Sequence, residues 1–278
     1  MKSQRLLFFL SLQIFYIQPT RTIAKPIVGV NVREPRANEM EFSAVVSIVS
    51  VFNTSANNEQ QFQDDIICSG TLISLVHVVT AEHCAQGTRN HRIEVIAGSI
   101  DIRLGCRYPL FWWVTHNQWA VSQLRRNRYT VNDISVIKLL GQVHGSIVPA
   151  VLSNLSKKRL VGASATMAGW GKLNNEEIPM IIHVANVTIL SDFDCLAIHH
   201  QFYDFTYHMP ASDICSVNEP YVLLEHGDSG GPLLQGNVIV GVNLGTFPFH
   251  DMGFHPELAN IHVTIHYYRV FLSHLLNN

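Results

Sequence analysis

Short apolar runs separated by polar turns recur along most of this chain. Clusters of glycine, asparagine, aspartate and serine lie between the runs, and such clusters favour turns. The segment 237–244 alternates, with Val238, Val240 and Val242 on one side, as in a strand with one buried face. Other short apolar runs occupy residues 42–52, 68–74, 93–97, 134–139 and 184–190. The pattern therefore predicts many short strands.

The end of the chain has a different period. Tyr268, Phe271, Leu272 and Leu275 recur at helical spacing, so we expect them on one face of a helix over residues 266–276. Many short strands followed by one final helix indicate an all-β fold.

Composition and charge narrow the class of protein. The chain has 278 residues, of which 47% are hydrophobic, and this is enough to build a sizeable core. The formal net charge is −2, and the main basic cluster, Arg125, Arg126 and Arg128, is typical of a solvated loop. The absence of a basic stripe argues against a nucleic-acid partner.

The N-terminus has the pattern of a secretory signal. Lys2 and Arg5 precede an apolar stretch over residues 6–17 that is too short to span a bilayer. The tripeptide 22–24, Thr-Ile-Ala, is a tolerable small-residue cleavage site. We therefore expect a signal peptide over residues 1–24 and a secreted, extracellular protein without membrane attachment after signal removal.

The glycine-rich segment 227–233, Gly-Asp-Ser-Gly-Gly-Pro-Leu, carries candidate chemistry. Glycines allow tight turns, so the amide N–H groups of Gly227 and Ser229 could bind an oxyanion while the Ser229 hydroxyl attacks. A serine hydroxyl needs a base and an orienting carboxylate. Upstream, His83 in Thr-Ala-Glu-His-Cys and Asp133 in Asn-Asp-Ile-Ser-Val-Ile-Lys-Leu supply these groups.

A rival interpretation uses the same serine. The residues Gly227, Ser229 and Gly231 also satisfy the G-x-S-x-G pattern of α/β-hydrolases. That fold needs a helix after the serine and its aspartate and histidine downstream. Here Pro232 and an alternating strand follow, and both partners lie upstream, so we exclude an esterase of this kind.

The order His83, Asp133, Ser229 resembles that of the trypsin/chymotrypsin family of serine peptidases. Three further segments match the family, namely Ile27-Val28-Gly29, residues 68–73 and residues 168–171. The resemblance implies two antiparallel β-barrels of the chymotrypsin type with a C-terminal helix and the site in the cleft between them. It divides the chain into a short propeptide at 25–26 and a peptidase domain at 27–278, with the first barrel over 27–142 and the second barrel and helix over 143–278.

The resemblance also implies roles. Ser229 would attack a peptide carbonyl to form an acyl-enzyme, His83 would act as general base, and Asp133 would orient His83. Asp228 would pair with the ammonium of Ile27 once proteolysis frees it. The resemblance thus implies a serine endopeptidase that requires no cofactor, acts on polypeptides and is open to inhibitors of the serpin type.

The cysteines fit a secreted member of this family. The resemblance pairs Cys68 with Cys84 and Cys195 with Cys215, in an oxidising compartment. Cys106 is left as a free thiol or an intermolecular link, and both readings stay open. The cysteine spacings lack CxxC and the chain lacks HExxH, so no metal site is expected. Glycosylation sequons begin at Asn53, Asn154 and Asn186.

Several positions depart from the family pattern. Glu82 replaces a small residue beside His83, and Asn243-Leu244-Gly245 stands where Ser-Trp-Gly is usual. Glu225 stands where the family has a cysteine whose partner is also missing here, so the pocket wall must be held differently. These departures motivate an alternative function, a catalytically silent homologue that acts as a binding or regulatory module.

The resemblance makes a prediction about specificity. Leu223 occupies the base of the primary pocket, where an aspartate would pair with substrate arginine or lysine. We therefore expect little cleavage after Arg or Lys and a preference for apolar residues. Asn243 and Gly245 belong to the substrate-binding strand, and Asn260 falls where a glycine often lines the pocket, which would favour small or medium side chains.

The activation segment is unusual. Signal cleavage after Ala24 would leave Lys25-Pro26 ahead of Ile27. A trypsin-like activator would meet a Lys–Pro bond, which lacks an amide N–H. Removal of one X-Pro dipeptide by a dipeptidyl peptidase would instead free Ile27 directly, and this is the activation that we expect.

Overall fold

The computed structural model describes residues 27–29, 31–36, 42–51, 66–85, 92–124, 132–172, 177–248 and 255–277. The expected signal peptide at 1–24, the propeptide at 25–26 and the sequon at Asn53 lie outside these residues. Within them, no helix combines the length and the apolar character needed to cross a membrane.

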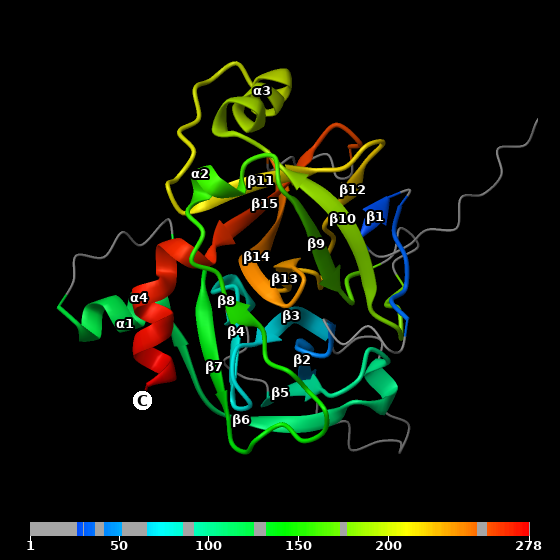
Figure 1. The fold of residues 1–278 in the computed structure, drawn as a ribbon, viewed down its shortest axis with the longest axis vertical. Helices are drawn as coiled ribbons and strands as arrows, with labels where there is room; N and C mark the ends of the chain where they lie inside the picture. The colour runs from blue at the N-terminus through cyan, green and yellow to red at the C-terminus, as the bar shows by residue number, and fades with distance from the viewer. Residues whose placement is uncertain are drawn as a thin grey trace, which may run out of the picture.

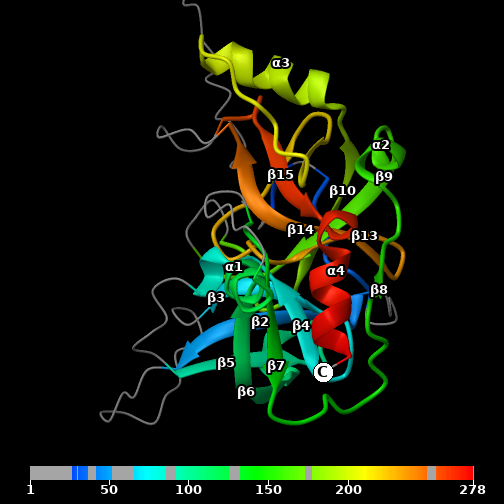
Figure 2. The same cartoon turned by 90° about the vertical axis from the view of Figure 1, so that its left-hand side faces the viewer.

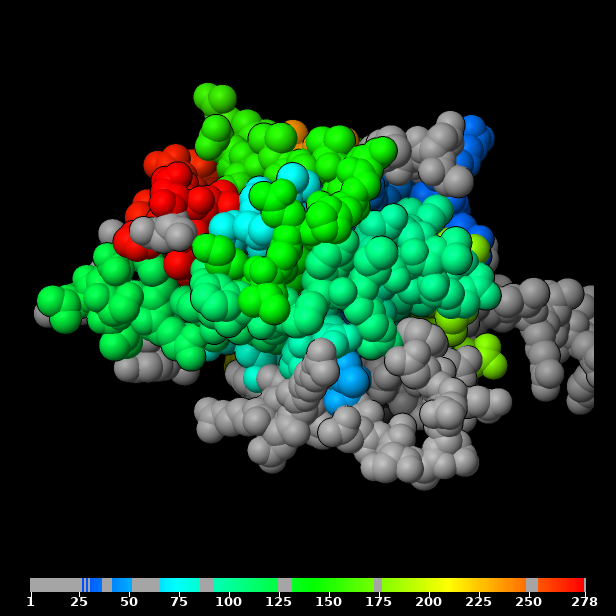
Figure 3. Space-filling model, turned by 90° about the horizontal axis from the view of Figure 1, so that it is seen from below, coloured from blue at the N-terminus to red at the C-terminus, as the bar shows by residue number. Residues whose placement is uncertain are grey.

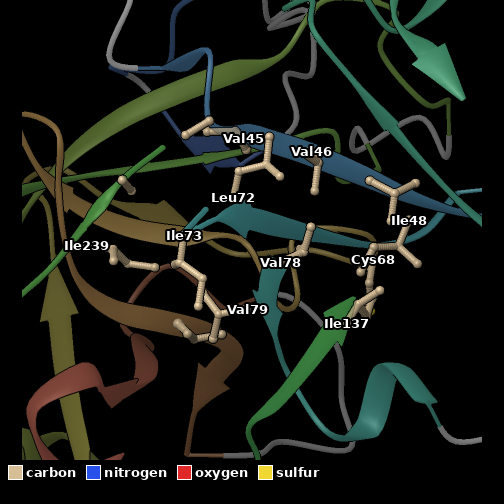
Figure 4. Packing of buried hydrophobic residues seen from close by; sticks show 14 of the residues in the cluster. Val45, Val46, Ile48, Cys68, Leu72, Ile73, Val78, Val79, Ile137 and Ile239 are labelled. Carbon is tan, nitrogen blue, oxygen red and sulfur yellow. The ribbon is translucent and has the colours of Figure 1, made fainter. Parts of the chain in front are cut away.

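Six antiparallel strands close into the first barrel, in the order β2-β3-β4-β7-β6-β5 (Figure 1). Ile48, Val78 and Ile137, from β2, β4 and β7, lie together in its interior, and each is 0% exposed (Figure 4). Burying such a side chain contributes about 1.5–3 kcal/mol, so the β-branched runs of the sequence account for this barrel. Its strands are β2 (Val45–Val51), β3 (Ile66–Leu72), β4 (His77–Thr80), β5 (Arg92–Ala97), β6 (Cys106–Thr115) and β7 (Ser135–Leu139).

A second ring of six strands lies above the first in Figure 2. The order is β13-β9-β10-β11-β15-β14, and a further pairing of β13 with β14 closes the ring. The two-residue β8 (Val151–Leu152) adds to β14 in parallel. The strands of this second ring are β9 (Ser164–Gly169), β10 (His183–Ile189), β11 (Asp213–Val217), β13 (Pro232–Gln235), β14 (Val238–Phe247) and β15 (Ala259–Thr264). The predicted pair of antiparallel barrels is confirmed.

Apolar packing is continuous between the two barrels. Ile239 and Val242 of β14, in the second barrel, belong to the same buried cluster as Val79 and Ile137 of the first. The predicted C-terminal helix is α4 (Ile265–Leu276), and its Phe271 packs on Trp119 of α1 (His116–Ser122), with ring centroids 5.4 Å apart. Figure 3 shows α4, in red, beside α1 at one edge of the first barrel. The helix that follows the second barrel is therefore anchored on the first.

The two other helices, α2 (Lys157–Leu160) and α3 (Asp192–Phe202), belong to the second half of the chain. Neither was predicted. α2 is one turn long, and the apolar residues of α3 do not form a stripe, because Phe193 is 81% exposed while Cys195 and His199 are buried.

The described N-terminal segment packs on the second barrel. The strand β1 (Val28–Gly29) pairs with β12 (Val222–Leu223), and Arg33 forms a bridge with Val184 of β10. The division drawn from the sequence assigned residues 27–142 to the first barrel. Among the described residues, Arg33 bridges to β10 of the second barrel, and Phe271 of α4 packs on α1 beside the first barrel.

Candidate active site

His83 begins a short 3-10 turn, and Ala81 and Glu82 connect this turn to the end of β4. Nδ1 of His83 lies 2.7 Å from Oδ2 of Asp133, and its backbone N–H donates to Oδ1 of the same carboxylate at 2.9 Å. A carboxylate accepts only, so Nδ1–H is the donor and Nε2 is left as the basic nitrogen. The side chains of His83 and Asp133 are 38% and 32% exposed, so the pair remains open to solvent on one side.

Asp133 precedes β7, and the hydrogen bonds of its neighbour Asn132 fix the backbone at this point. The Asn132 amide donates to Asn117 of α1 at 3.1 Å and accepts from the Tyr268 hydroxyl of α4 at 3.3 Å. These contacts anchor the loop before β7 to two helices. The loop that carries Asp133 is therefore fixed from outside the barrel.

Glu82 lies within the same network. Both of its carboxylate oxygens accept from Nδ2 of Asn117, at 3.3 and 3.0 Å. Burial raises the pKa of Glu82, the hydrogen bond from Asn117 opposes that shift, and the charge of Asp133 adds to it. Glu82 thus links the His83 turn to the Asp133 loop through α1, a role that the sequence did not predict.

Ser229 lies in the turn before β13 and meets the first barrel. Its carbonyl accepts from the Ser69 N–H of β3 at 2.8 Å, and Sγ of Cys84 lies 3.8 Å from the same oxygen. The fold therefore places the Ser229 turn against the His83 turn. The Ser229 hydroxyl donates to the Leu244 carbonyl at 3.0 Å in this conformation.

Two amide groups around Ser229 are free in the described part of the chain. The N–H groups of Asp228, Gly230 and Gly231 donate to backbone carbonyls, whereas those of Gly227 and Ser229 have no acceptor there. Gly227 adopts φ +99°, a conformation that favours glycine, and this turns the peptide at that point. Two unpartnered N–H groups beside a serine hydroxyl can hold an oxyanion.

Asp228 points away from this surface into the protein and is 0% exposed. Its carboxylate accepts from the N–H groups of Gly171 at 2.8 Å and Glu225 at 3.0 Å, and from that of Ile27. Burial raises the pKa of Asp228 to about 7, since these hydrogen bonds only partly offset the loss of water. Among the described residues no cation is paired with the Asp228 carboxylate, and the backbone N–H of Ile27 is already beside it.

The glycines Gly169 and Gly171 make room for Asp228. A Cβ atom at either position would overlap the Asp228 carboxylate. The two glycines of segment 168–171, which matched the family, are thus required to accommodate the buried Asp228 carboxylate.

Residues expected in the primary pocket are more enclosed than predicted. Leu223 is 2% exposed because β12 pairs with β1, and Asn243 and Asn260 are 0% exposed. The Asn260 amide accepts from the Leu224 N–H at 2.7 Å, so it contacts backbone and presents no surface to a substrate in this conformation. Gly245 is the one of these four positions that is partly exposed.

The structure contains both disulfides implied by the resemblance, Cys68–Cys84 and Cys195–Cys215, and leaves Cys106 as an exposed free thiol. His83 lies close to the sulfurs of Cys68 and Cys84. Both sulfurs are oxidised in the disulfide, so this group offers no thiolate to a metal ion.

Two sequons fall on described residues. Asn154 is exposed, and Asn186 and Thr188 both face solvent on β10. Their positions leave the acceptor side chains accessible.

One buried cluster was missed altogether. His262 of β15 is 0% exposed and contacts Ser216 and Asn243. Its signal in the sequence was the pair of polar residues Asn260 and His262, two positions apart within the short strand β15.

The comparisons with known proteins agree on one family. The family model described as Trypsin matches residues 31–256. Trypsin delta of Drosophila melanogaster is 31% identical over 182 residues, which cover 63% of this chain and 66%, just under two thirds, of that relative. Kallikrein-4 of Homo sapiens is 27% identical over 193 residues, which cover 69% of this chain and 72% of the relative.

A solved structure is also similar to this chain. It is that of neuropsin, described as a serine protease expressed in the limbic system of mouse brain, with a TM-score of 0.67 and 20% identity. The match covers 88% of this chain and 98% of the neuropsin chain. At this identity the likeness concerns the fold, and it agrees with the predicted chymotrypsin type.

Proposed function

This chain belongs to the trypsin family of serine peptidases, and on that premise we propose that it is a secreted serine endopeptidase. The observation that carries the proposal is the 2.7 Å contact between His83 and Asp133 beside the Ser229 turn. With Nδ1–H donated to Asp133, Nε2 of His83 is the nitrogen available as a base, and Cys84, next to His83, contacts the Ser229 carbonyl.

The proposed reaction uses these groups in order. The Ser229 hydroxyl leaves the Leu244 carbonyl, transfers its proton to Nε2 of His83 and attacks the peptide carbonyl. Asp133 accepts the hydrogen bond from Nδ1–H and stabilises the imidazolium. The N–H groups of Gly227 and Ser229 bind the oxyanion, and loss of one such donor typically costs about 3 kcal/mol in the transition state. His83 then protonates the leaving amine, and water hydrolyses the acyl-enzyme.

The proposed specificity is for small or medium apolar residues. Leu223 offers no carboxylate, and its enclosure beneath β1 supports a shallow pocket. Glu225 is the nearest carboxylate along the loop, and its backbone N–H donates to Asp228. A basic substrate side chain would thus find no buried anion at the position of Leu223.

The proposed activation frees the amino group of Ile27. The Ile27 N–H already donates to Asp228, and no cation is paired with Asp228 in the described part of the chain. Removal of Lys25-Pro26 by a dipeptidyl peptidase would supply an ammonium at this point. Inhibitors of the serpin type remain proposed partners, and Asn154 and Asn186 remain proposed glycosylation sites.

The experiment is labelling with a fluorophosphonate probe, which reacts with activated serines. The chain should be tested after its N-terminus has been verified, beside Ser229→Ala as a matched control. Labelling and peptide cleavage by the wild type alone would support the enzyme. Equal labelling of the two proteins, with both folded, would overturn it in favour of the catalytically silent homologue.

A further inference from the structure

Four polar side chains lie inside the second barrel, where an apolar core is the norm. Ser216 of β11, Asn243 of β14, and Asn260 and His262 of β15 are each 0% exposed. Asn260 and His262 are two residues apart, so their side chains share one face of β15. We call these four residues the polar brace. Buried polar groups cost free energy unless they are hydrogen-bonded, so the burial of these four side chains needs an explanation.

His262 is the centre of the polar brace. Its Nδ1 lies 2.9 Å from Oδ1 of Asn243 and its Nε2 lies 2.8 Å from Oγ of Ser216. Burial lowers the pKa of His262 to about 3, so the ring is neutral. Nδ1–H therefore donates to Asn243, and Nε2 accepts from the Ser216 hydroxyl.

Asn243 depends on this contact. Its Nδ2 is buried and has no hydrogen-bond partner among the described residues, so His262 makes the side chain's one hydrogen bond there. The Asn243 backbone is bound to the nucleophile turn, because its carbonyl accepts from Gly230 at 2.7 Å and its N–H donates to Gly231 at 2.8 Å. Asn243 thus connects His262 to Gly230 and Gly231, the two residues that follow Ser229.

Asn260 holds the other end of the same loop. Its Oδ1 accepts from the Leu224 N–H at 2.7 Å, and its Nδ2 donates to the Val222 carbonyl at 2.7 Å and to the Ser216 carbonyl at 3.4 Å. The loop from Leu224 to Gly231 is therefore attached to β15 at both ends, directly through Asn260 and through Asn243 by way of His262.

The sequence gives a reason for such an attachment. Glu225 stands where the resemblance leads one to expect a cysteine, and no cysteine follows Cys215. The wall beside Ser229 therefore has no covalent tie at Glu225. The hydrogen bonds of the polar brace hold the residue directly before Glu225.

We propose that Asn260 and His262 are positioning residues that hold the 224–231 loop in the geometry that presents Ser229, in place of a disulfide. The proposal rests on the proposed peptidase function, because Ser229 is the group that is presented. Neither residue contacts substrate. Each acts through the backbone that it holds.

Two substitutions at one site separate the two contacts of His262. Asn carries its amide nitrogen two bonds from Cβ, like Nδ1 of histidine, whereas Gln carries it three bonds away, like Nε2. His262→Asn can therefore keep the donor to Asn243, and His262→Gln loses it. Both variants remove the ring and place an amide in the same cavity, so each serves as the control for the other.

The measurement is the second-order rate constant of fluorophosphonate labelling, with the unfolding temperature of each variant. Because a displacement of about 1 Å can lower a rate roughly 100-fold, His262→Gln should label about 10- to 100-fold more slowly than the wild type. His262→Asn should stay within about threefold of the wild type. Val187→Ala, in the core of β10, should lower the unfolding temperature without slowing labelling.

Equal labelling rates for His262→Gln, His262→Asn and the wild type would overturn the proposal, as would an equally slow Val187→Ala. A second readout does not require activity. Hydrogen exchange of the amides in residues 224–231 should be faster in His262→Gln than in His262→Asn. If the wild type fails to label but exchange differs in this way, the peptidase function fails and the brace stands as a structural device. Equal exchange in the two variants would overturn the brace itself.

Discussion

The carboxylate of Asp133 binds His83 twice, at the imidazole Nδ1 at 2.7 Å and at the backbone N–H at 2.9 Å. One contact orients the ring and the other fixes the turn that carries it. The two residues are 50 positions apart in the sequence, and the pairing of β4 with β7 brings them together.

Asp133→Asn should lower kcat by about 10⁴-fold while the protein stays folded, because an amide can hold the wrong tautomer of His83. Turnover of a peptide substrate and the far-ultraviolet circular dichroism spectrum would be measured together. A loss of less than about tenfold would mean that Asp133 does not serve the reaction.

The stability of the uncleaved chain should fall as pH rises from about 4 to about 7. Asp228 has its pKa raised from 3.8 to about 7 by burial, so the folded state binds more protons than the unfolded state in this window. The stabilisation is fully present at the acid end and is lost as pH passes through the folded pKa. Denaturant unfolding of the wild type and Asp228→Asn at several pH values checks this.

The free energy of unfolding of the wild type, minus that of Asp228→Asn, should fall between about pH 4 and about pH 7 and stay constant at higher pH. A difference that is constant with pH would contradict the buried, protonated Asp228. In a chain that begins at Ile27, the ammonium should stabilise the carboxylate and remove most of this pH dependence.

A positional-scanning peptide library should show cleavage after small or medium apolar residues, because Leu223 supplies no anion to a basic side chain. Cleavage after Arg or Lys should be minor. Dominant cleavage after Arg would show that another carboxylate reaches the pocket, and Glu225→Gln would then identify it by abolishing that preference.

Treatment with a proline-specific dipeptidyl peptidase should convert an inactive chain that begins at Lys25 into an active one that begins at Ile27. The freed ammonium would meet Asp228, which Ile27 already contacts. N-terminal sequencing and probe labelling before and after treatment follow the change. Ile27→Gly should activate poorly, since the Ile27 side chain is 0% exposed. Full activity from a chain that still begins at Lys25 would exclude this route.

Secondary structure could be predicted from the sequence where the spacing of apolar residues matches the period of a strand or a helix. The alternation Val238, Val240, Val242 predicted a strand, although Ile239 and Asn243 on the opposite face of β14 are buried as well. The spacing of Tyr268 and Phe271 predicted a helix, because both side chains lie on its buried face. The helices α1 and α3 were missed, since α1 begins directly from β6 through a Thr115 cap and α3 has no continuous apolar stripe. Those helices owe their stability to tertiary packing and caps.

Hydrophobic periods predicted the many short strands and the final helix, and short motifs predicted the family and, through that resemblance, the two barrels. Periods and motifs are properties of neighbouring residues and can be recognised without the fold. Three contacts could be known only from the folded chain: the Ser229 hydroxyl donates to Leu244, Asn260 binds the Leu224 backbone, and His262 contacts Asn243. These contacts join segments that are 15 to 36 residues apart in the sequence. Their partners are selected by register and burial, which arise only when the barrel closes.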